Sequence, residues 1–197
     1  MSLIIKTERL ILRRYRKADL EDILEFSRTT DWWLERILPW EVDSQDITDY
    51  WEKVKDLNPF KDPRWFDLVI EVKSLGKVAG IVGYGVTVID EQHKQGMVGW
   101  LLGCDYQGQG YASEAAQAII TFGFSELSLH RISARTGMDN APSWKMMERL
   151  GMRREAHFRE SHTVKGQWRD EYIYAVLLHE WQTSTRNTPR NTQSNND

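Results

Sequence analysis

The clearest chemistry in this sequence lies in a glycine-rich turn, Gln107-Gly108-Gln109-Gly110. The turn separates a strand-like stretch, Met97 to Leu102, from a stretch with helical apolar spacing that begins at Ala112. Glycines allow backbone N–H groups to turn toward one point, and a helix N-terminus adds unpaired donors and the positive end of its dipole. A strand, a glycine turn and a helix in this order predict a phosphate-binding site.

Spacing decides which kind of phosphate site the turn could form. A P-loop requires Lys followed by Ser or Thr after its last glycine, but Tyr111-Ala112 stands there. A dinucleotide-binding turn requires a third glycine where this chain has Ser113. The pattern that fits, Gln107-x-x-Gly110-x-Ala112, resembles the pyrophosphate-binding signature of the GNAT acetyl-CoA N-acetyltransferases. Taken alone, the segment could also be an ordinary strand-to-helix turn.

Three further segments resemble the same family at the expected places. The start, Thr7-Glu8-Arg9-Leu10, is similar to the opening strand of the ribosomal-protein N-terminal acetyltransferases, one branch of the family. Asn140-x-x-Ser143 followed by Leu150-Gly151-Met152 resembles the family's fourth helix, and Gly166 to Glu171 resembles the final hairpin of that branch. The resemblance covers about Thr7 to Trp181.

The resemblance implies acetyl-CoA as the cosubstrate and assigns residues to it. The pantetheine arm would pair with the backbone of Trp100, Leu101 and Leu102, with Asn140 and Ser143 on the opposite side. The Leu102 N–H would donate to the oxyanion that forms from the thioester, a type of contact whose loss costs about a hundredfold or more in rate. The pyrophosphate would lie on Gln107, Gly108, Gln109, Gly110, Tyr111 and Ala112.

Acetyl transfer also needs a proton donor for the departing thiolate. Much of the family uses a Tyr seven residues after the motif Asn, but this chain has Met147 there, which cannot donate a proton. The branch resemblance implies Ser143 instead, and a hydroxyl suffices because a thiol has an ordinary pKa of about 8.5. The alternative is that Ser143 is simply a first-turn helix residue.

The general base is predicted to be His162, with Glu160 in reserve. An α-amine has a pKa of about 8 and attacks in its neutral form, and an imidazole with a pKa of about 6.5 can take its proton. Strand alternation places Phe158, Glu160 and His162 on one face, predicted to point inward at Phe158. A solvated histidine at a strand end is the alternative.

The stretch from Asp31 to Trp65 is rich in tryptophan and is predicted to contact the acceptor. Trp32, Trp33 and Trp40 would line an acceptor pocket because indoles offer a large contact area at low entropic cost. The alternative is that they cover the core. A short helix is expected over about Ile47 to Val54.

The element order predicts a mixed α/β domain over residues 1–181, followed by a disordered polar tail at 182–197. The resemblance implies a GNAT fold, with a central, mainly antiparallel sheet of six to seven strands, helices on both faces, and strands four and five splayed apart.

The composition limits the classes of function. A net charge of −3 over 197 residues gives no reason to expect a nucleic-acid partner, and the single cysteine excludes an internal disulfide. No metal-ligand spacing, no membrane-length apolar run and no signal-peptide core are present, so we expect no metal, no membrane partner and a cytoplasmic location. A homodimer is expected only from the family.

The function predicted from the sequence is acetyl transfer from acetyl-CoA to a primary amine by direct attack. The branch resemblance favours the N-terminal α-amine of a protein or peptide as acceptor. The alternatives are a small-molecule amine (an antibiotic, an amino acid or a polyamine) and a non-catalytic acyl-CoA sensor on the same fold.

Overall fold

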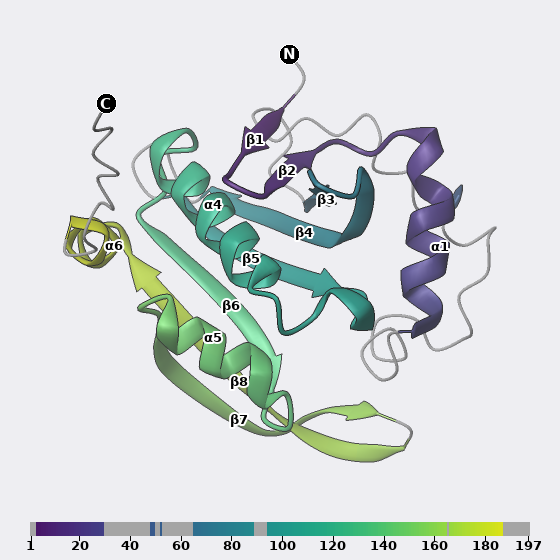
Figure 1. Cartoon of the computed structure of the whole chain (residues 1–197). Helices are drawn as coiled ribbons and strands as arrows, with labels where there is room; N and C mark the ends of the chain where they lie inside the picture. Colours follow the sequence, from purple (N-terminus) through teal and green to yellow (C-terminus); the bar gives the residue numbers. More distant parts are fainter. Residues whose placement is uncertain are drawn as a thin grey trace.

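The computed structural model describes residues 3–29, 48, 49, 52, 65–88, 94–164 and 166–186. Within these ranges one eight-stranded sheet has the order β1-β2-β3-β4-β5-β6-β8-β7 (Figure 1). Every neighbouring pair is antiparallel except β5 and β6, which are parallel. The strands are β1 (Ile4–Lys6), β2 (Leu10–Arg13), β3 (Phe66–Val72), β4 (Lys77–Val88), β5 (Lys94–Leu102), β6 (Arg131–Gly137), β7 (Arg153–Val164) and β8 (Gln167–Leu177).

The predicted mainly antiparallel sheet is confirmed, with one strand more than the upper end of the prediction. The extra strand arises because Thr7 to Arg9, expected to be extended, form the turn of a β1–β2 hairpin. The Thr7 N–H donates to the Leu10 carbonyl at 3.1 Å, and the Leu10 N–H donates back to Thr7 Oγ1 at 2.9 Å. A side chain that closes its own turn competes locally with the extended conformation.

Helices cover both faces of the sheet, as predicted. Along β3, Leu68 and Ile70 belong to a core that includes α4 and α5, whereas Val69 belongs to a smaller core with α1 on the opposite face. This division follows from the alternation of side chains along a strand. The helices are α1 (Leu20–Thr29), α4 (Tyr111–Ser125), α5 (Ala141–Arg149) and α6 (Leu178–Arg186).

The predicted disordered tail is wrong for residues 182–186, which form the end of α6. The buried Trp181 anchors this helix, with its ring centroid 6.2 Å from that of Phe124 on α4. The Leu177 N–H donates to Glu180 Oε2 at 2.9 Å beside the start of the helix. The rest of the tail lies outside the described residues, as does most of the expected Ile47–Val54 helix, of which 48, 49 and 52 are helical.

None of the helices in the described ranges combines the length and the apolar character that a membrane crossing requires.

The β5–β6 pair separates partway along its length, as the resemblance implied (Figure 1). Their register runs from Gln95 opposite Arg131 to Val98 opposite Ala134 and stops there, while β5 continues to Leu102. Beyond this point β5 stays paired with β4, and the Gly103 N–H donates to the Ala79 carbonyl at 3.0 Å. Because N–H groups alternate in direction along a strand, those of Trp100 and Leu102 point away from β4, toward the gap in the pairing.

Helix α4 lies close against the sheet because its contact position is a glycine. A Cβ atom on Gly123 would collide with the Tyr84 hydroxyl, which lies between Gly123 and Gly96 of β5. This hydroxyl is buried and has no hydrogen-bond partner within the described part of the chain, and burial raises the pKa of Tyr84. The close approach fixes the height of α4 over β4 and β5.

Because of this contact, a substitution that normally stabilises a helix should destabilise the protein at Gly123. Replacing glycine by alanine inside a helix usually stabilises it by about 1 kcal/mol, but here the clash should dominate. We expect Gly123→Ala to lower the free energy of unfolding in urea by about 2 kcal/mol. In a Tyr84→Phe background, which removes the nearest clash but leaves ring carbon Cζ 2.8 Å from the added Cβ, the loss should be smaller. An equal loss in both backgrounds would show that the hydroxyl does not set this spacing.

Candidate functional site

The predicted phosphate cradle is formed by backbone groups at the N-terminus of α4. A short 3-10 turn, η2 (Cys104–Tyr106), leads into the glycine loop. Gly108 and Gly110 have φ of 73° and 81°, a left-handed conformation that favours glycine. Gly110 is the N-cap, with no side-chain cap, and the first intrahelical bond runs from the Glu114 N–H to the Gly110 carbonyl at 3.0 Å. The N–H groups of residues 111–113 therefore have no acceptor within the helix and suit an anion.

Gln107 ties this loop to the end of β5. Its side-chain Nε2 donates to the Leu102 carbonyl at 3.1 Å. The strand end and the glycine loop are thereby held together as one unit. The structure thus places the predicted pyrophosphate residues beside the backbone predicted to meet pantetheine.

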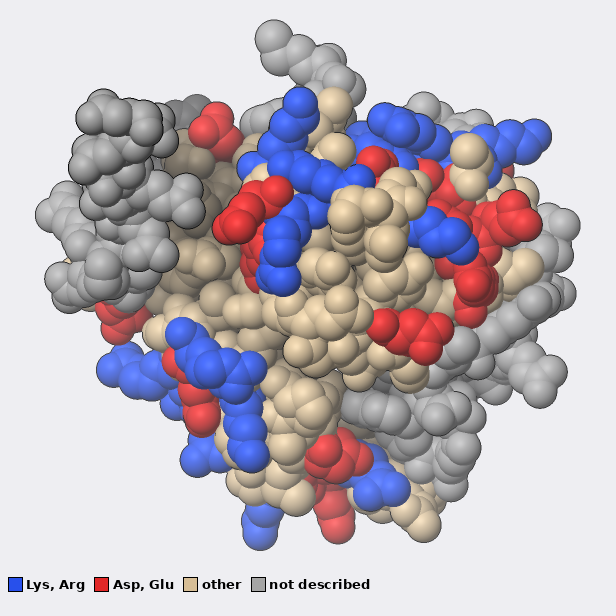
Figure 2. All heavy atoms as spheres, viewed as in Figure 1, with Lys and Arg blue, Asp and Glu red and all other residues tan. Residues whose placement is uncertain are grey.

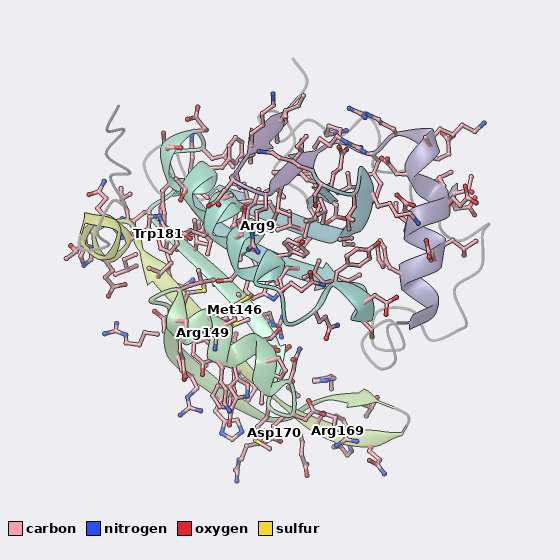
Figure 3. All side chains as sticks on the ribbon, viewed as in Figure 1. Arg9, Met146, Arg149, Arg169, Asp170 and Trp181 are labelled. Atoms are coloured by element: carbon pink, nitrogen blue, oxygen red, sulfur yellow. The ribbon has the colours of Figure 1, made fainter. Side chains whose placement is uncertain are left out.

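Arg9 belongs to the cradle, although the sequence predicts only a strand for its segment. Its guanidinium contacts Glu114 through Nε at 2.6 Å and the Gln109 carbonyl through Nη1 at 2.8 Å, and it lies 4.8 Å from the centroid of the Tyr111 ring. Figure 3 shows Arg9 in front of α4. The Thr-Glu-Arg motif was the available signal, but nothing in its spacing reveals a partner about a hundred residues away.

Glu114 joins the N-terminal turn to the first turn of α4. It accepts hydrogen bonds from the Thr7 hydroxyl at 2.5 Å and the Arg9 N–H at 2.8 Å. Burial alone would raise the pKa of Glu114, but these hydrogen bonds outweigh it and keep the pKa below its ordinary value. The ionised carboxylate balances the charge of Arg9. Figure 2 shows mostly uncharged residues at the centre of this face, so the anion site depends chiefly on backbone donors.

Trp100, Asn140 and Ser143 meet across the gap between β5 and β6. Asn140 is the N-cap of α5, and its Oδ1 accepts from the Ser143 N–H at 3.3 Å. The Trp100 indole N–H reaches over from β5 to the Ser143 hydroxyl at 3.4 Å. Met147 is 2% exposed and belongs to the core, so the position of the usual family Tyr is filled by an apolar side chain.

The predicted face of His162 and Glu160 needs correction. The β7–β8 register shifts between Phe158 and His162, so residues 159–161 lie opposite Asp170 alone. Glu160 sits in this bulge with φ of 49°, and its N–H donates to Asp170 Oδ1 at 3.0 Å. It therefore leaves the regular alternation, and Phe158 is 46% exposed rather than inward-facing. Figure 3 shows Asp170 and Arg169 where the β7–β8 hairpin extends beyond the sheet.

His162 has a polar neighbourhood that the sequence did not predict. Its Nδ1 lies 3.0 Å from the Ser161 hydroxyl, which is 3.5 Å from Glu171 Oε2. Glu171 is buried and also binds the Arg135 guanidinium. These contacts orient the imidazole. From the sequence, Glu171 stood out only as the last residue of the segment that resembles the final hairpin of the branch.

A second carboxylate that the sequence did not single out lies on the α1 face of the sheet. Asp67 of β3 is 5% exposed and accepts a hydrogen bond from the Trp65 indole N–H at 2.7 Å. Removal from water raises the pKa of Asp67 to about 7. The signal was a charged residue near the start of a mostly apolar run, Phe66 to Ile70.

Trp32, Trp33 and Trp40, predicted to bind the acceptor, lie outside the described residues. Across the parts of the chain that the structure does describe, no group of three or more His, Cys, Asp or Glu is arranged to hold a metal ion.

Comparison with known proteins connects this geometry to a family. Residues 9–153 match the acetyltransferase (GNAT) domain. YnaD of Bacillus subtilis (strain 168), an uncharacterised N-acetyltransferase, is 35% identical over 178 residues, which cover 90% of this chain and 98% of the relative. The ribosomal protein uS5-alanine N-acetyltransferase of Escherichia coli (strain K12) is 23% identical over 161 residues, 74% of this chain and 83% of the relative.

Solved structures of GNAT acetyltransferases have the same fold as this chain. A GNAT acetyltransferase from Bacillus anthracis superposes with a TM-score of 0.73 at 30% identity, covering 90% of this chain and 99% of its own. RimL, the ribosomal L7/L12 alpha-N-protein acetyltransferase solved with coenzyme A, has the same fold, with a TM-score of 0.76 at 18% identity and coverage of 89% and 98%. The chain therefore belongs to the GNAT acetyltransferase family and is an N-acetyltransferase.

Proposed function

We propose that this protein transfers the acetyl group of acetyl-CoA to the N-terminal α-amine of a protein or peptide. One observation carries the choice of cosubstrate. The uncapped N-terminus of α4, which suits a diphosphate, adjoins the end of β5, whose backbone is left without a strand partner toward β6. Coenzyme A offers a diphosphate and an amide-bearing arm in the same order.

Each part of the site has a role in this proposal. The N–H groups of residues 111–113 bind the pyrophosphate, and the outward backbone groups of Trp100 pair with the pantetheine amides. Asn140 contributes its side-chain amide from the opposite side of the gap. The Leu102 N–H donates to the thioester oxygen as that oxygen gains charge.

The transfer needs two proton movements. The amine gives up a proton to His162, or to Glu160 in reserve, and its lone pair forms the bond to the acetyl carbon. The carbon–sulfur bond then breaks, and the thiolate takes a proton from the Ser143 hydroxyl, which regains one from water. The Trp100 indole positions that hydroxyl. No group of the enzyme is acetylated in this scheme.

Two relatives support the choice of acceptor. The relative from Escherichia coli is named for alanine N-acetylation of a ribosomal protein, and RimL for alpha-N-acetylation of another.

A free-thiol release assay against N-terminal peptides and small amines tests this choice of acceptor, with peptides expected to react faster. Acetyl-CoA binding without turnover on any amine would favour the sensor alternative. A cytoplasmic location and a homodimer stay predictions.

The proposed pyrophosphate site at the N-terminus of α4 predicts the effect of a negative charge at Gly110. A carboxylate there repels the diphosphate and fills its seat, so Gly110→Glu should weaken acetyl-CoA binding by at least about tenfold in calorimetry. Gly166→Glu is the matched control, because Gly166 has a similar φ of 73° but lies in the β7–β8 turn with open space around it. Undiminished binding by Gly110→Glu would refute the assignment of the cradle.

The assignment of the base predicts a pH-dependent loss. Removing a general base costs about 10²–10⁴-fold, so His162→Ala should lower kcat/KM for a good acceptor by at least a hundredfold and should alter the acidic limb of the pH profile. If kcat/KM changes by less than about threefold and that limb is unchanged, His162 is not the base. Glu160→Gln, measured alongside, shows whether the proton goes to the reserve carboxylate.

A further inference from the structure

One row of residues crosses the α1 face of the sheet and ends at the gap between β5 and β6. Asp67 of β3 pairs with Gly83 of β4, and Gly83 pairs with Gly99 of β5. Asp67 shares its face with Val69, and Gly99 shares its face with Leu101, both of which pack in the core beneath α1. Gly99 directly follows Val98, where β5 stops pairing with β6. The row therefore leads from a carboxylate to the mouth of the gap, on the face opposite α4 and α5.

The glycines in this region make room for the two side chains that approach the gap. A Cβ atom on Gly83 would collide with the Asp67 carboxylate and the Trp65 indole. Cβ atoms on Gly85 and Gly99 would lie 3.0 Å and 3.2 Å from the same indole. The Trp65 ring thus spans from β3 over β4 to the gap-facing strand β5. This close approach requires glycine at three positions on two strands.

Among the residues that the structure describes, none supplies a counter-charge to the Asp67 carboxylate. Its one hydrogen bond in the described structure comes from the neutral Trp65 indole, and no Lys, Arg or His of the described residues pairs with it. The Asp67 charge contributes, after burial, to the raised pKa of Tyr15. A buried carboxylate without a cation is costly, and proteins normally pair such a group. An ammonium group would supply the missing charge.

The neighbouring indole suits the same ligand. Trp65 is 37% exposed beside a carboxylate that is 5% exposed. Indole faces attract cations, and they do so more strongly as water is excluded. A carboxylate and an indole on the same side of the sheet therefore offer an ammonium both of its preferred contacts.

We propose that Asp67 and Trp65 form the acceptor subsite and bind the protonated primary amine on the α1 face before transfer. This inference rests on the proposed function, since it names how the acceptor amine is recognised. The cosubstrate enters over α4 and α5, and the amine meets it from the opposite face of the sheet. The subsite selects acceptors that carry a positive charge at the reacting end and rejects neutral amides of the same shape.

The Trp65 indole N–H offers a direct spectroscopic readout, because it donates to Asp67. Trialanine amide, whose only charge is its α-ammonium, is titrated into the ¹⁵N-labelled protein, and the Trp65 indole resonance is identified by its absence in Trp65→Phe. We expect a saturating shift with trialanine amide and none with its N-acetylated form. Asp67→Asn, which keeps an acceptor oxygen for the indole, should abolish the shift, whereas Glu25→Gln, which removes an exposed carboxylate from α1, should preserve it.

The same variants separate this inference from the proposed function. In the transfer assay Asp67→Asn should raise the KM for the peptide amine at least tenfold, leaving kcat within about threefold and acetyl-CoA affinity unchanged. An unresponsive indole resonance, or an equal shift in Asp67→Asn, would overturn the subsite. If the wild-type protein shifts with the amine but transfers no acetyl group to any amine, the subsite stands and the proposed function fails.

Discussion

The constraint on which this site depends is the end of the hydrogen-bond ladder between β5 and β6. Buried backbone donors and acceptors must find partners, and the ladder supplies them only as far as Val98 and Ala134. Beyond that point β5 follows β4, and β6 follows β8 through the pairing of Arg135 with Ile173. The two strands therefore diverge because each keeps its other neighbour. The outward N–H groups of Trp100 and Leu102 are thereby left facing the gap, while the Leu102 carbonyl accepts from the Gln107 side chain.

The divergence also separates the tasks of the two faces of the sheet. On one face, α4 and α5 bring a helix N-terminus and the Ser143 hydroxyl to the gap. On the opposite face, glycines on β4 and β5 leave room for the Trp65 indole and the Asp67 carboxylate. Side chains at these positions would collide with the Trp65 indole and the Asp67 carboxylate and displace them from the approach to the gap. In the proposed scheme the two reactants meet through the gap in the sheet rather than compete for one surface.

Much of this arrangement could be predicted from local sequence. The left-handed glycines of the cradle follow from their spacing before a helix, and Asn140 and Gly151 mark the two ends of α5, with Gly151 at φ of 80°. The clamp of Arg9 on Glu114 could not be predicted, because it joins residues about a hundred positions apart. The β7 bulge was missed because alternation in sequence does not show an unpaired insertion. The end of α6 was predicted as a polar tail because the sequence has no apolar residue from Gln182 onward.

The most direct test of the account is residue-resolved amide hydrogen exchange with and without coenzyme A. The Trp100 and Leu102 N–H groups point toward the gap, whereas the Leu101 N–H points toward β4. Coenzyme A should slow exchange at Trp100, at Leu102 and at residues 111–113 by more than about tenfold and leave Leu101 unchanged. Protection that ignores this alternation, or no protection at Leu102, would contradict the claim that the unpaired edge of β5 holds the cosubstrate.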